Sequence, residues 1–237
     1  MLWPGNKKKA VTLSYDDGTL HDRRFIELLN KYGVKCTFNL VSGCFRDDYL
    51  TVDPDETPIE EHRFLNVSKA EVAELYKGHE VATHSLTHPN LTELSYDEIC
   101  HEINEDVKNL ERLTGEKIKG FAYPYGAYDD NVIKALKDCN IKYARTVNST
   151  KEFTLPEDFL LWHPTAYHEH EDIMETVKRF LDCDEEGALF YLWGHSYEFY
   201  IGDKWGLIED ILKAFASHSD EIWFATNGEI YDYVTAK

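Results

Sequence analysis

Long hydrophobic segments are absent from this 237-residue chain, and no apolar run approaches the roughly 20 residues that a membrane-spanning helix needs. The chain also lacks the apolar stretch and the small-residue cleavage site of a signal peptide, because the lysines at positions 7–9 lead directly into a strand-like segment. We therefore expect neither membrane insertion nor export, and we expect a cytoplasmic location.

Cysteine pairs are absent as well. The five cysteines are odd in number and widely scattered, and no two of them form a Cys-x-x-Cys pair. A disulfide framework usually has an even number of cysteines, and a thiolate zinc site has closely spaced pairs, so the sequence predicts neither. A reducing compartment is the simpler environment for such a chain.

Positive charge is scarce. The sequence holds 25 Lys and Arg against 44 Asp and Glu, which gives a formal net charge of −19. Because nucleic-acid binding depends largely on neutralising phosphates with Lys and Arg, a nucleic acid is a poor partner for this chain. The charge is instead typical of a solvated, self-repelling surface.

Short strand-like runs alternate with longer helical patterns. Residues 9–15 are predicted as a strand, 20–32 as a helix and 35–40 as a strand, which is a βαβ opening. No repeat or linker divides the chain, so we expect one domain over residues 1–237. Further strands, which bring the total to about seven or eight β/α units, are predicted at residues 80–83, 119–122, 142–147, 188–193 and 221–226.

This alternation fits either a closed, mostly parallel barrel or an open doubly wound sheet, and periodicity does not choose between them. The acidic segment 44–66, which contains Pro54 and Pro58, is predicted as a long loop that lies beside the site as a lid. Residues 153–170 are predicted as a second irregular stretch.

Capping signals mark the starts of two helices. Ser68 with Glu71, and Ser95 with Glu98, have the spacing of capping boxes. Gly115 is expected to end the second of these helices.

Two adjacent carboxylates, Asp16 and Asp17, follow the apolar part of the first predicted strand in the motif Ser-Tyr-Asp-Asp-Gly. Parallel α/β folds present functional side chains at the carboxyl ends of their strands. Neighbouring side chains point in different directions from an extended backbone, so one carboxylate can face a metal ion and the other a substrate, while Gly18 permits a sharp exit. Taken alone, the pair is also typical of a helix N-terminus.

His84 and His88 follow the predicted strand at residues 80–83 with a spacing of four residues. On a helical turn this spacing places both imidazoles on one side, within reach of one ion. With 11 histidines in the chain, such a pair also arises by chance and is weak evidence alone. Together with Asp17, however, the two imidazoles would leave open positions for water at a catalytic divalent cation.

Two further strand ends carry candidate groups. The turn Tyr-Pro-Tyr-Gly around Tyr125 can fix a backbone N–H toward a cleft, where it would suit a developing oxyanion, although such turns are common in ordinary loops. His195 follows the strand predicted at residues 188–193 and can protonate a leaving amine. A single strand-end histidine is more often a satisfied polar group, so its place in this series is what favours catalysis.

The order of these segments resembles the polysaccharide deacetylase family, also called the NodB homology domain or carbohydrate esterase family 4. The resemblance rests on Ser-Tyr-Asp-Asp-Gly, His-Ser-Leu-Thr-His, Phe-Ala-Tyr-Pro-Tyr-Gly and the late histidine, and covers roughly residue 9 to the chain end. It implies an α/β fold, a distorted (β/α) barrel of about seven parallel strands. It also implies a bound divalent metal, commonly zinc (Zn2+), with cobalt, manganese or iron as alternatives.

Carried over residue by residue, the resemblance implies a role for each candidate. Asp16 would be the general base and His195 the general acid, while Tyr125 would donate its backbone N–H to the oxyanion. The implied metal ligands are Asp17, His84 and His88.

The chain departs from the family pattern in three places. Ala122 stands where the family often has an arginine that orients the base. Arg145, at the end of the next predicted strand, is the expected substitute, and the alternative for Arg145 is a surface ion pair. The family's Asp-rich, Trp-containing fourth motif has no clear copy before Trp162, and in the late Leu-x-His motif the leucine is replaced by Trp193.

Two secondary expectations concern the surroundings of these residues. Tyr125, Trp193 and Tyr197 could stack on a sugar ring or could simply pack in the core. Residues 162–170 contain a second histidine-rich patch, which is a competing metal site.

These assignments predict a metal-dependent hydrolase that removes N-acetyl groups from an amino sugar or an N-acetylated glycan. The missing arginine and the altered late motif leave two alternatives on the same scaffold: a hydrolase of cyclic imides or other small amides, and a noncatalytic carbohydrate-binding protein. The expected partner is a carbohydrate or small-amide substrate, with no nucleic acid and no membrane. The oligomeric state stays open.

Overall fold

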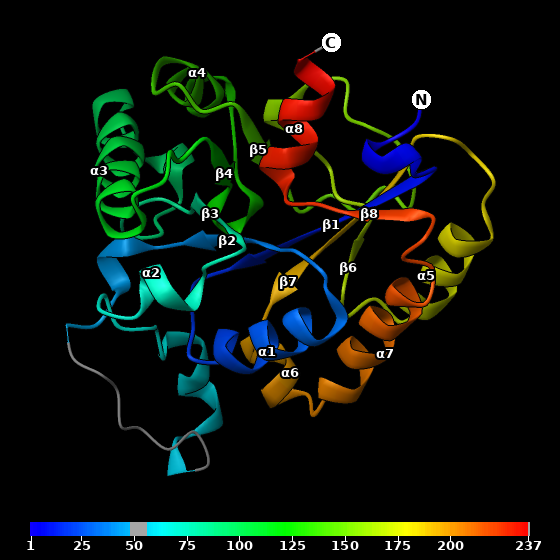
Figure 1. Ribbon diagram of the computed structural model, residues 1–237. Helices are drawn as coiled ribbons and strands as arrows, with labels where there is room; N and C mark the ends of the chain where they lie inside the picture. The colour runs from blue at the N-terminus through cyan, green and yellow to red at the C-terminus, as the bar shows by residue number, and fades with distance from the viewer. Residues whose placement is uncertain (48–55, 237) are drawn as a thin grey trace.

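Parallel strands form the central sheet of the protein in a computed structural model that describes residues 1–47 and 56–236 (Figure 1). Within these residues the strands are β1 (Lys9–Asp16), β2 (Thr37–Leu40), β3 (Glu80–Thr83), β4 (Gly120–Ala122), β5 (Tyr143–Arg145), β6 (Ala166–Tyr167), β7 (Ala188–His195) and β8 (Ile222–Phe224). Their hydrogen-bonded order is β5-β4-β3-β2-β1-β7-β6, and β8 pairs with the first three residues of β1.

The sheet curls until its two ends approach each other at Trp162. The N–H of Trp162 donates to the carbonyl of Ala144 in β5 (3.0 Å), and the carbonyl of Trp162 accepts from the N–H of Thr146 (3.1 Å). A few residues later the chain enters β6, which pairs with β7. The predicted distorted (β/α) barrel is confirmed, with seven strands around the ring and β8 added beside β1.

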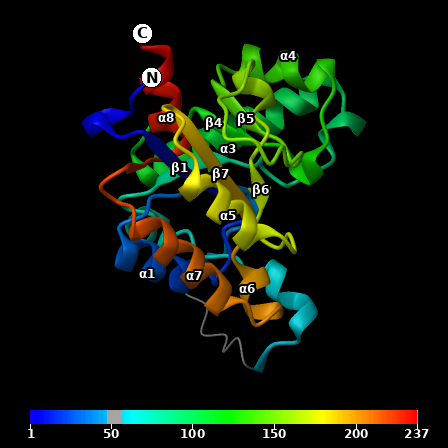
Figure 2. The same ribbon diagram turned by 90° about the vertical axis from the view of Figure 1, so that its right-hand side faces the viewer.

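Helices surround the sheet (Figures 1 and 2). Among them, α1, α7 and α5 pack side by side, and α3 packs against α4. Their bounds are α1 (Asp22–Tyr32), α2 (Val72–Leu75), α3 (Tyr96–Thr114), α4 (Asp130–Asp138), α5 (Ile173–Asp182), α6 (Tyr197–Ile201), α7 (Trp205–Ala216) and α8 (Asn227–Thr235).

Strand β1 lies at the centre of the core. All eight of its residues are buried, as expected for a parallel strand covered on both faces. On one of these faces, the ring of Tyr15 packs against Phe25 of α1, with 4.3 Å between ring centroids. Phe25 also contacts Phe38 of β2, so the apolar face of α1 fixes the first two strands.

The register of the strands places polar groups at one level. Asp16, the last residue of β1, lies opposite Asn39 of β2 and opposite His195, the last residue of β7. The carboxyl ends of these parallel strands therefore bring residues far apart in sequence to one end of the barrel.

The predicted strands agree with the observed ones to within two residues at each end. One strand, β6, was missed inside the irregular stretch 153–170, because two residues are too short to show an alternating pattern. In the predicted loop 44–66, residues 48–55, including Pro54, lie outside the described residues. The remainder contains the short 3-10 helix η4 (Ile59–Phe64).

One of the two predicted capping boxes is confirmed. Ser95 and Glu98 cap α3 reciprocally, and Gly115 ends that helix with a φ of 74°. The other prediction was wrong in part: Glu71 accepts from the N–H of Ser68 (2.7 Å), but the buried Oγ of Ser68 finds no partner among the described residues. The chain makes a turn there, and the four-residue helix α2 starts only after Glu71.

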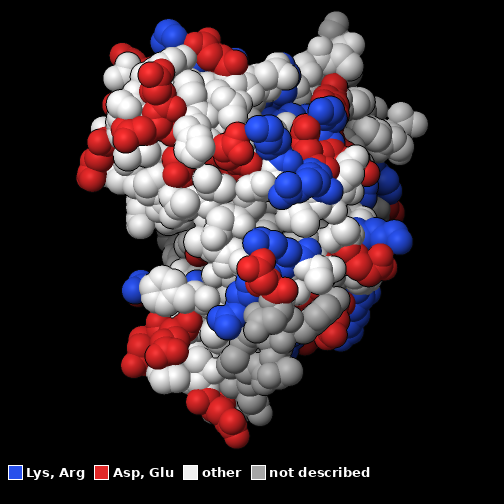
Figure 3. All heavy atoms as spheres, turned by 90° about the vertical axis from the view of Figure 1, so that its left-hand side faces the viewer, with Lys and Arg blue, Asp and Glu red and all other residues white. Residues whose placement is uncertain are grey.

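The negative charge is distributed unevenly. On the face that α3 covers, Asp and Glu gather over the upper left and again near the bottom, whereas Lys and Arg lie mainly across the middle (Figure 3). Several lysines have an acidic partner; for example, Lys117 bonds Glu111 (2.9 Å) and Lys119 pairs with Asp232. None of the helices in the described ranges combines the length and apolarity that crossing a bilayer requires.

We predict that Ser95→Ala lowers the free energy of unfolding by about 1 kcal/mol, because it removes the side-chain cap of α3. Urea denaturation of both proteins measures this difference. Ser68→Ala is the matched control and should change stability by less than about 0.5 kcal/mol, since its hydroxyl caps nothing. Equal losses in the two variants would contradict this account of the caps.

Candidate active site and metal centre

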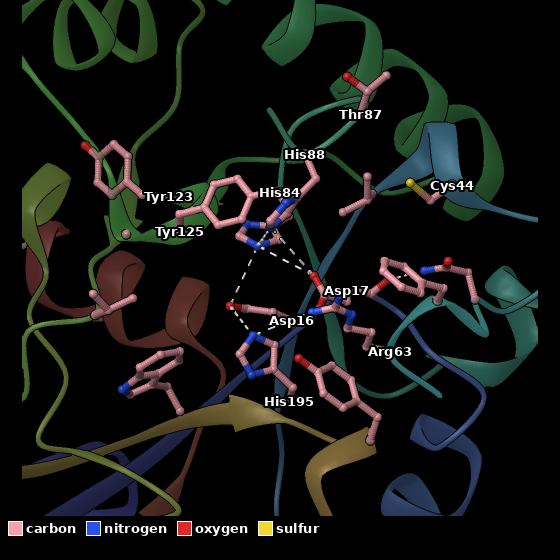
Figure 4. A pocket seen from close by; sticks show the side chains of 17 residues that line it. Asp16, Asp17, Cys44, Arg63, His84, Thr87, His88, Tyr123, Tyr125 and His195 are labelled. Atoms are coloured by element: carbon pink, nitrogen blue, oxygen red, sulfur yellow. Dashed lines mark hydrogen bonds and ion pairs between the residues drawn. The ribbon is translucent and has the colours of Figure 1, made fainter. Parts of the chain in front are cut away.

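The carboxyl ends of β1, β3 and β7 open into a cavity of about 680 Å3 (Figure 4). Most of the sequence-predicted site residues line this cavity, and Arg145 lies beneath it in contact with Asp16. The lining members of that set are Asp16, Asp17, His84, His88, Tyr125 and His195.

The two carboxylates diverge because the backbone turns sharply between them. Asp16 is still in β1, whereas Asp17 has a φ of 78° and Gly18 a φ of 65°. A left-handed conformation is costly for a residue with a side chain, and strain of this kind is often found at functional sites. The carbonyl of Asp17 is held by the side-chain amide of Asn66 (2.8 Å).

His84, His88 and Asp17 meet at one point. The Nε2 atoms of the two histidines lie 3.1 Å apart, and Asp17 Oδ1 lies 3.8 Å from the first and 3.9 Å from the second. Zinc bonds of about 2.0–2.2 Å in a tetrahedral site separate ligand atoms by roughly 3.4 Å, which these separations approach. This trio is the only group of three or more candidate ligands within 1–47 and 56–236 that could hold an ion.

The histidine pair converges for a different reason from the one predicted. The segment after β3 is a loop rather than a helical turn, and both Ser85 (φ 67°) and His88 (φ 58°) are left-handed. Glu102 of α3 holds this loop by accepting from both the N–H and the hydroxyl of Thr87, each at 2.8 Å. Sequence reasoning missed Glu102, which carries no signal beyond its place in an amphipathic helix.

His84 is oriented by the backbone. Its Nδ1 lies 2.8 Å from the carbonyl of Ala122, an arrangement that protonates Nδ1 and leaves the Nε2 lone pair facing the trio. Burial lowers the pKa of His84 to about 4. The imidazole is therefore neutral near pH 7, which is the form that binds cations.

Asp16 is held in place as an anion. The Nδ2 of Asn39 donates to its Oδ1 (2.8 Å), and the guanidinium of Arg145 contacts its Oδ2. Burial raises the pKa of Asp16, but Arg145, His84 and the other nearby groups outweigh burial and lower it overall. Asp16 Oδ2 also lies 3.9 Å from His195 Nε2 and 3.8 Å from His84 Nε2, so this carboxylate stands between the late histidine and the metal-ligand candidates.

Arg145, the residue expected to substitute for the missing arginine, contacts Asp16. It is the register partner of Ala122 on the neighbouring strand β5, so its side chain reaches Asp16 from one strand further along the barrel. Only 1% of Arg145 is exposed, which excludes the alternative of a surface ion pair. The ring of Trp193 packs against the guanidinium, with 4.4 Å from Cζ to the ring centroid.

Glu198 is a second residue that sequence reasoning did not assign. Its Oε2 lies 3.1 Å from Nδ1 of His195, and its Oε1 accepts from the hydroxyl of Tyr167 (2.5 Å). Burial lowers the pKa of His195, but the hydrogen bond with Glu198 and the charge of Asp17 outweigh it and raise that pKa to about 9. Glu198 lies three residues after His195, at the start of α6, and this short spacing is the signal that could have identified it.

The predictions for the other aromatic and histidine residues have different outcomes. Tyr125 is left-handed (φ 57°), 70% exposed, and its ring packs on His88 at 4.5 Å. Trp193 is instead mostly buried against Arg145. The histidine-rich patch at 162–170 does not form a metal cluster in the described part of the chain, where His168 is buried 3.3 Å from Glu198.

Comparison with known proteins supports the same family. Residues 4–144, more than half of the chain, match the family described as polysaccharide deacetylase. The chain is 30% identical over 131 residues to a peptidoglycan-N-acetylglucosamine deacetylase of Bacillus cereus, covering 54% of this chain and 40% of that one. That deacetylase and the other curated relatives that the chain matches first are matched over less than half of their own length.

Two solved structures share the fold. The Xyl-CE4 domain of a multidomain xylanase from the hindgut metagenome of Trinervitermes trinervoides has a TM-score of 0.60 at 19% identity, over 97% of this chain and 92% of that one. A CE4 family pseudoenzyme from Bacillus anthracis has a TM-score of 0.55 at 23% identity, over 96% and 66%. The match over residues 4–144, with the barrel described above, shows that the chain belongs to the polysaccharide deacetylase family.

Proposed function

We propose that the protein is a metal-dependent hydrolase that removes the acetyl group from the amide nitrogen of an amino sugar or an N-acetylated glycan. The observation that carries the proposal is the pairing of a ligand trio with a separate, ionised carboxylate. Asp17, His84 and His88 converge, while Asp16 beside them is held by Asn39 and Arg145.

The donor set fits a divalent cation, with zinc preferred over cobalt, manganese or iron because two imidazoles and one carboxylate are common zinc ligands. Asp17, His84 and His88 would hold the ion. When bound, it would polarise the acetamide carbonyl and lower the pKa of water.

The protein's own groups then divide the proton transfers. Asp16 accepts a proton from the water as the water oxygen bonds to the carbonyl carbon, and the backbone N–H of Tyr125 stabilises the oxyanion. His195, protonated near pH 7 because of its raised pKa, donates a proton to the nitrogen as the C–N bond breaks. Acetate and a free amine are the products.

One of the two sequence features that suggested the alternative activities has an explanation in the structure. The absent arginine at Ala122 suggested both a cyclic-imide hydrolase and a noncatalytic binding protein, and the altered late motif at Trp193 also suggested the imide hydrolase. Arg145 supplies a guanidinium to Asp16 from the adjacent strand, so the base has its partner. Acetate release from N-acetylglucosamine oligomers, assayed beside a panel of imides with zinc or cobalt added, tests the choice, and no cleavage of any amide would refute the hydrolase.

Asp16→Asn should lower kcat by about 10²- to 10⁴-fold, because it removes the proposed base. Metal content, measured on the same preparation by mass spectrometry, should stay unchanged, since Asp16 is not among the proposed ligands. Wild-type turnover in this variant would show that the base lies elsewhere.

His88→Ala should weaken zinc binding at least tenfold, because one of three protein ligands is lost. Calorimetric titration of chelator-treated protein measures the affinity, and added zinc should raise the melting temperature of the wild type more than that of the variant. His163→Ala, in the histidine-rich patch outside the trio, is the matched control and should bind zinc like wild type. Equal affinity in all three proteins would remove the metal assignment.

Glu198→Gln should move the alkaline limb of the pH–rate profile to lower pH. His195 acts as an acid only below its pKa, and Glu198 helps to raise that pKa to about 9, so neutralising the carboxylate lowers the limit. The profile of kcat/KM measures this shift. An unchanged alkaline limb would mean that His195 is not the group that sets it.

A further inference from the structure

Arg63 differs in its surroundings from the other charged residues of the cavity. Besides Arg63, the charged groups of the lining are the carboxylates Asp16 and Asp17 and the imidazole of His195, which has Glu198 as its partner. Asp16 has Arg145 as its partner, and Asp17 belongs to the proposed ligand trio. Arg63 makes no ion pair or hydrogen bond with any residue that the structure describes, although the chain holds 44 Asp and Glu.

The side chain of Arg63 reaches into the cavity beside Asp17 (Figure 4). Its guanidinium lies over the ring of Phe64, 4.5 Å from the centroid, a contact that orders the group without neutralising its charge. Burial raises the pKa of the Tyr197 phenol, and the charge of Arg63 works against that rise, so its field extends to another lining residue. The N–H groups at the edge of the guanidinium stay available to a ligand.

The segment that carries Arg63 is attached firmly to the barrel. His62 is fully buried in η4, stacked on Tyr200 with 4.4 Å between centroids, and its Nδ1 lies 3.1 Å from Nε2 of His21. Just after Arg63, the carbonyl of Leu65 accepts from the N–H of Leu20 (2.7 Å). The position of Arg63 relative to the loop that bears Asp17 is therefore fixed on both sides.

We propose that Arg63 selects amino sugars that carry an anionic group, a carboxylate or a phosphate, near the acetamide that is hydrolysed. The inference rests on the proposed deacetylase function. A planar guanidinium matches both oxyanions through paired hydrogen bonds. Among the described residues, Arg63 is the one charged side chain of the cavity lining without an opposite partner. A neutral sugar would leave the guanidinium unpaired, whereas an anionic sugar would form an ion pair with it.

The test compares three disaccharides with the zinc-loaded protein: chitobiose, which is neutral; N-acetylglucosaminyl-N-acetylmuramic acid, which adds a carboxylate; and 6-phosphorylated chitobiose. At least one anionic substrate should have a kcat/KM about tenfold above that of chitobiose, mainly through KM, since charged hydrogen bonds contribute this much. The preference should shrink in high salt. The anionic substrate with the higher kcat/KM shows whether Arg63 recognises a carboxylate or a phosphate.

Arg63→Gln should abolish the preference and leave chitobiose turnover within about twofold of wild type. Arg179→Gln is the matched control, because Arg179 is also exposed and lies over an aromatic ring, that of Phe153, but on α5 outside the cavity. The control should keep the preference. Equal kcat/KM for all three substrates in wild type, or an equal loss on all three in Arg63→Gln, would overturn the proposal.

A binding measurement separates this inference from the function on which it rests. If no disaccharide loses acetate, calorimetric Kd values for the same sugars decide the role of Arg63, while the hydrolase proposal fails only if the oligomers and the amide panel described above are not cleaved either. Tighter binding of an anionic sugar that disappears in Arg63→Gln supports the role. Equal Kd values for neutral and anionic sugars in wild type refute it.

Discussion

The buried ion pair between Asp16 and Arg145 is the constraint on which the site depends. Both side chains are almost fully excluded from solvent, at 3% and 1% exposure, and a buried charge is costly unless a partner and further hydrogen bonds compensate it. Asn39 and the Thr146 carbonyl supply these bonds. The pair therefore requires β1, β2 and β5 to meet at one end of the barrel, and it keeps Asp16 ionised.

The division of work between neighbouring carboxylates follows from a backbone turn. Asp16 ends β1 inside the ring of strands, while the left-handed conformation of Asp17 directs its carboxylate toward the two histidines. The histidine loop meets it with two left-handed residues of its own, and Glu102 holds that loop from α3. Backbone strain on both sides thus replaces the helical turn as the cause of the convergence.

A second set of contacts surrounds His195. Glu198 binds its Nδ1, and Tyr167 in turn binds Glu198, so the imidazole keeps one orientation and a proton. Close packing in this region also explains why residue 194 is a glycine, because a Cβ at that position would lie 1.8 Å from Nδ1 of His168. Asp16, Asp17 and His195 each have a local partner, so among the charged side chains that line the cavity in the described residues Arg63 is the one without an opposite charge.

The sequence by itself determined the alternation of strands and helices, the strand ends that carry Asp16, His84 and His195, and the α3 cap, because these depend on short-range periodicity and spacing. The family resemblance, rather than periodicity, chose the barrel. Sequence position suggested Arg145 as the partner of Asp16, but only the tertiary structure decided between that role and a surface ion pair, and only it showed that Glu198 contacts His195. The pairing of Arg145 depends on the register between neighbouring strands, and the contact of Glu198 depends on how the start of α6 follows β7. Register and packing arise from long-range contacts that no local pattern encodes.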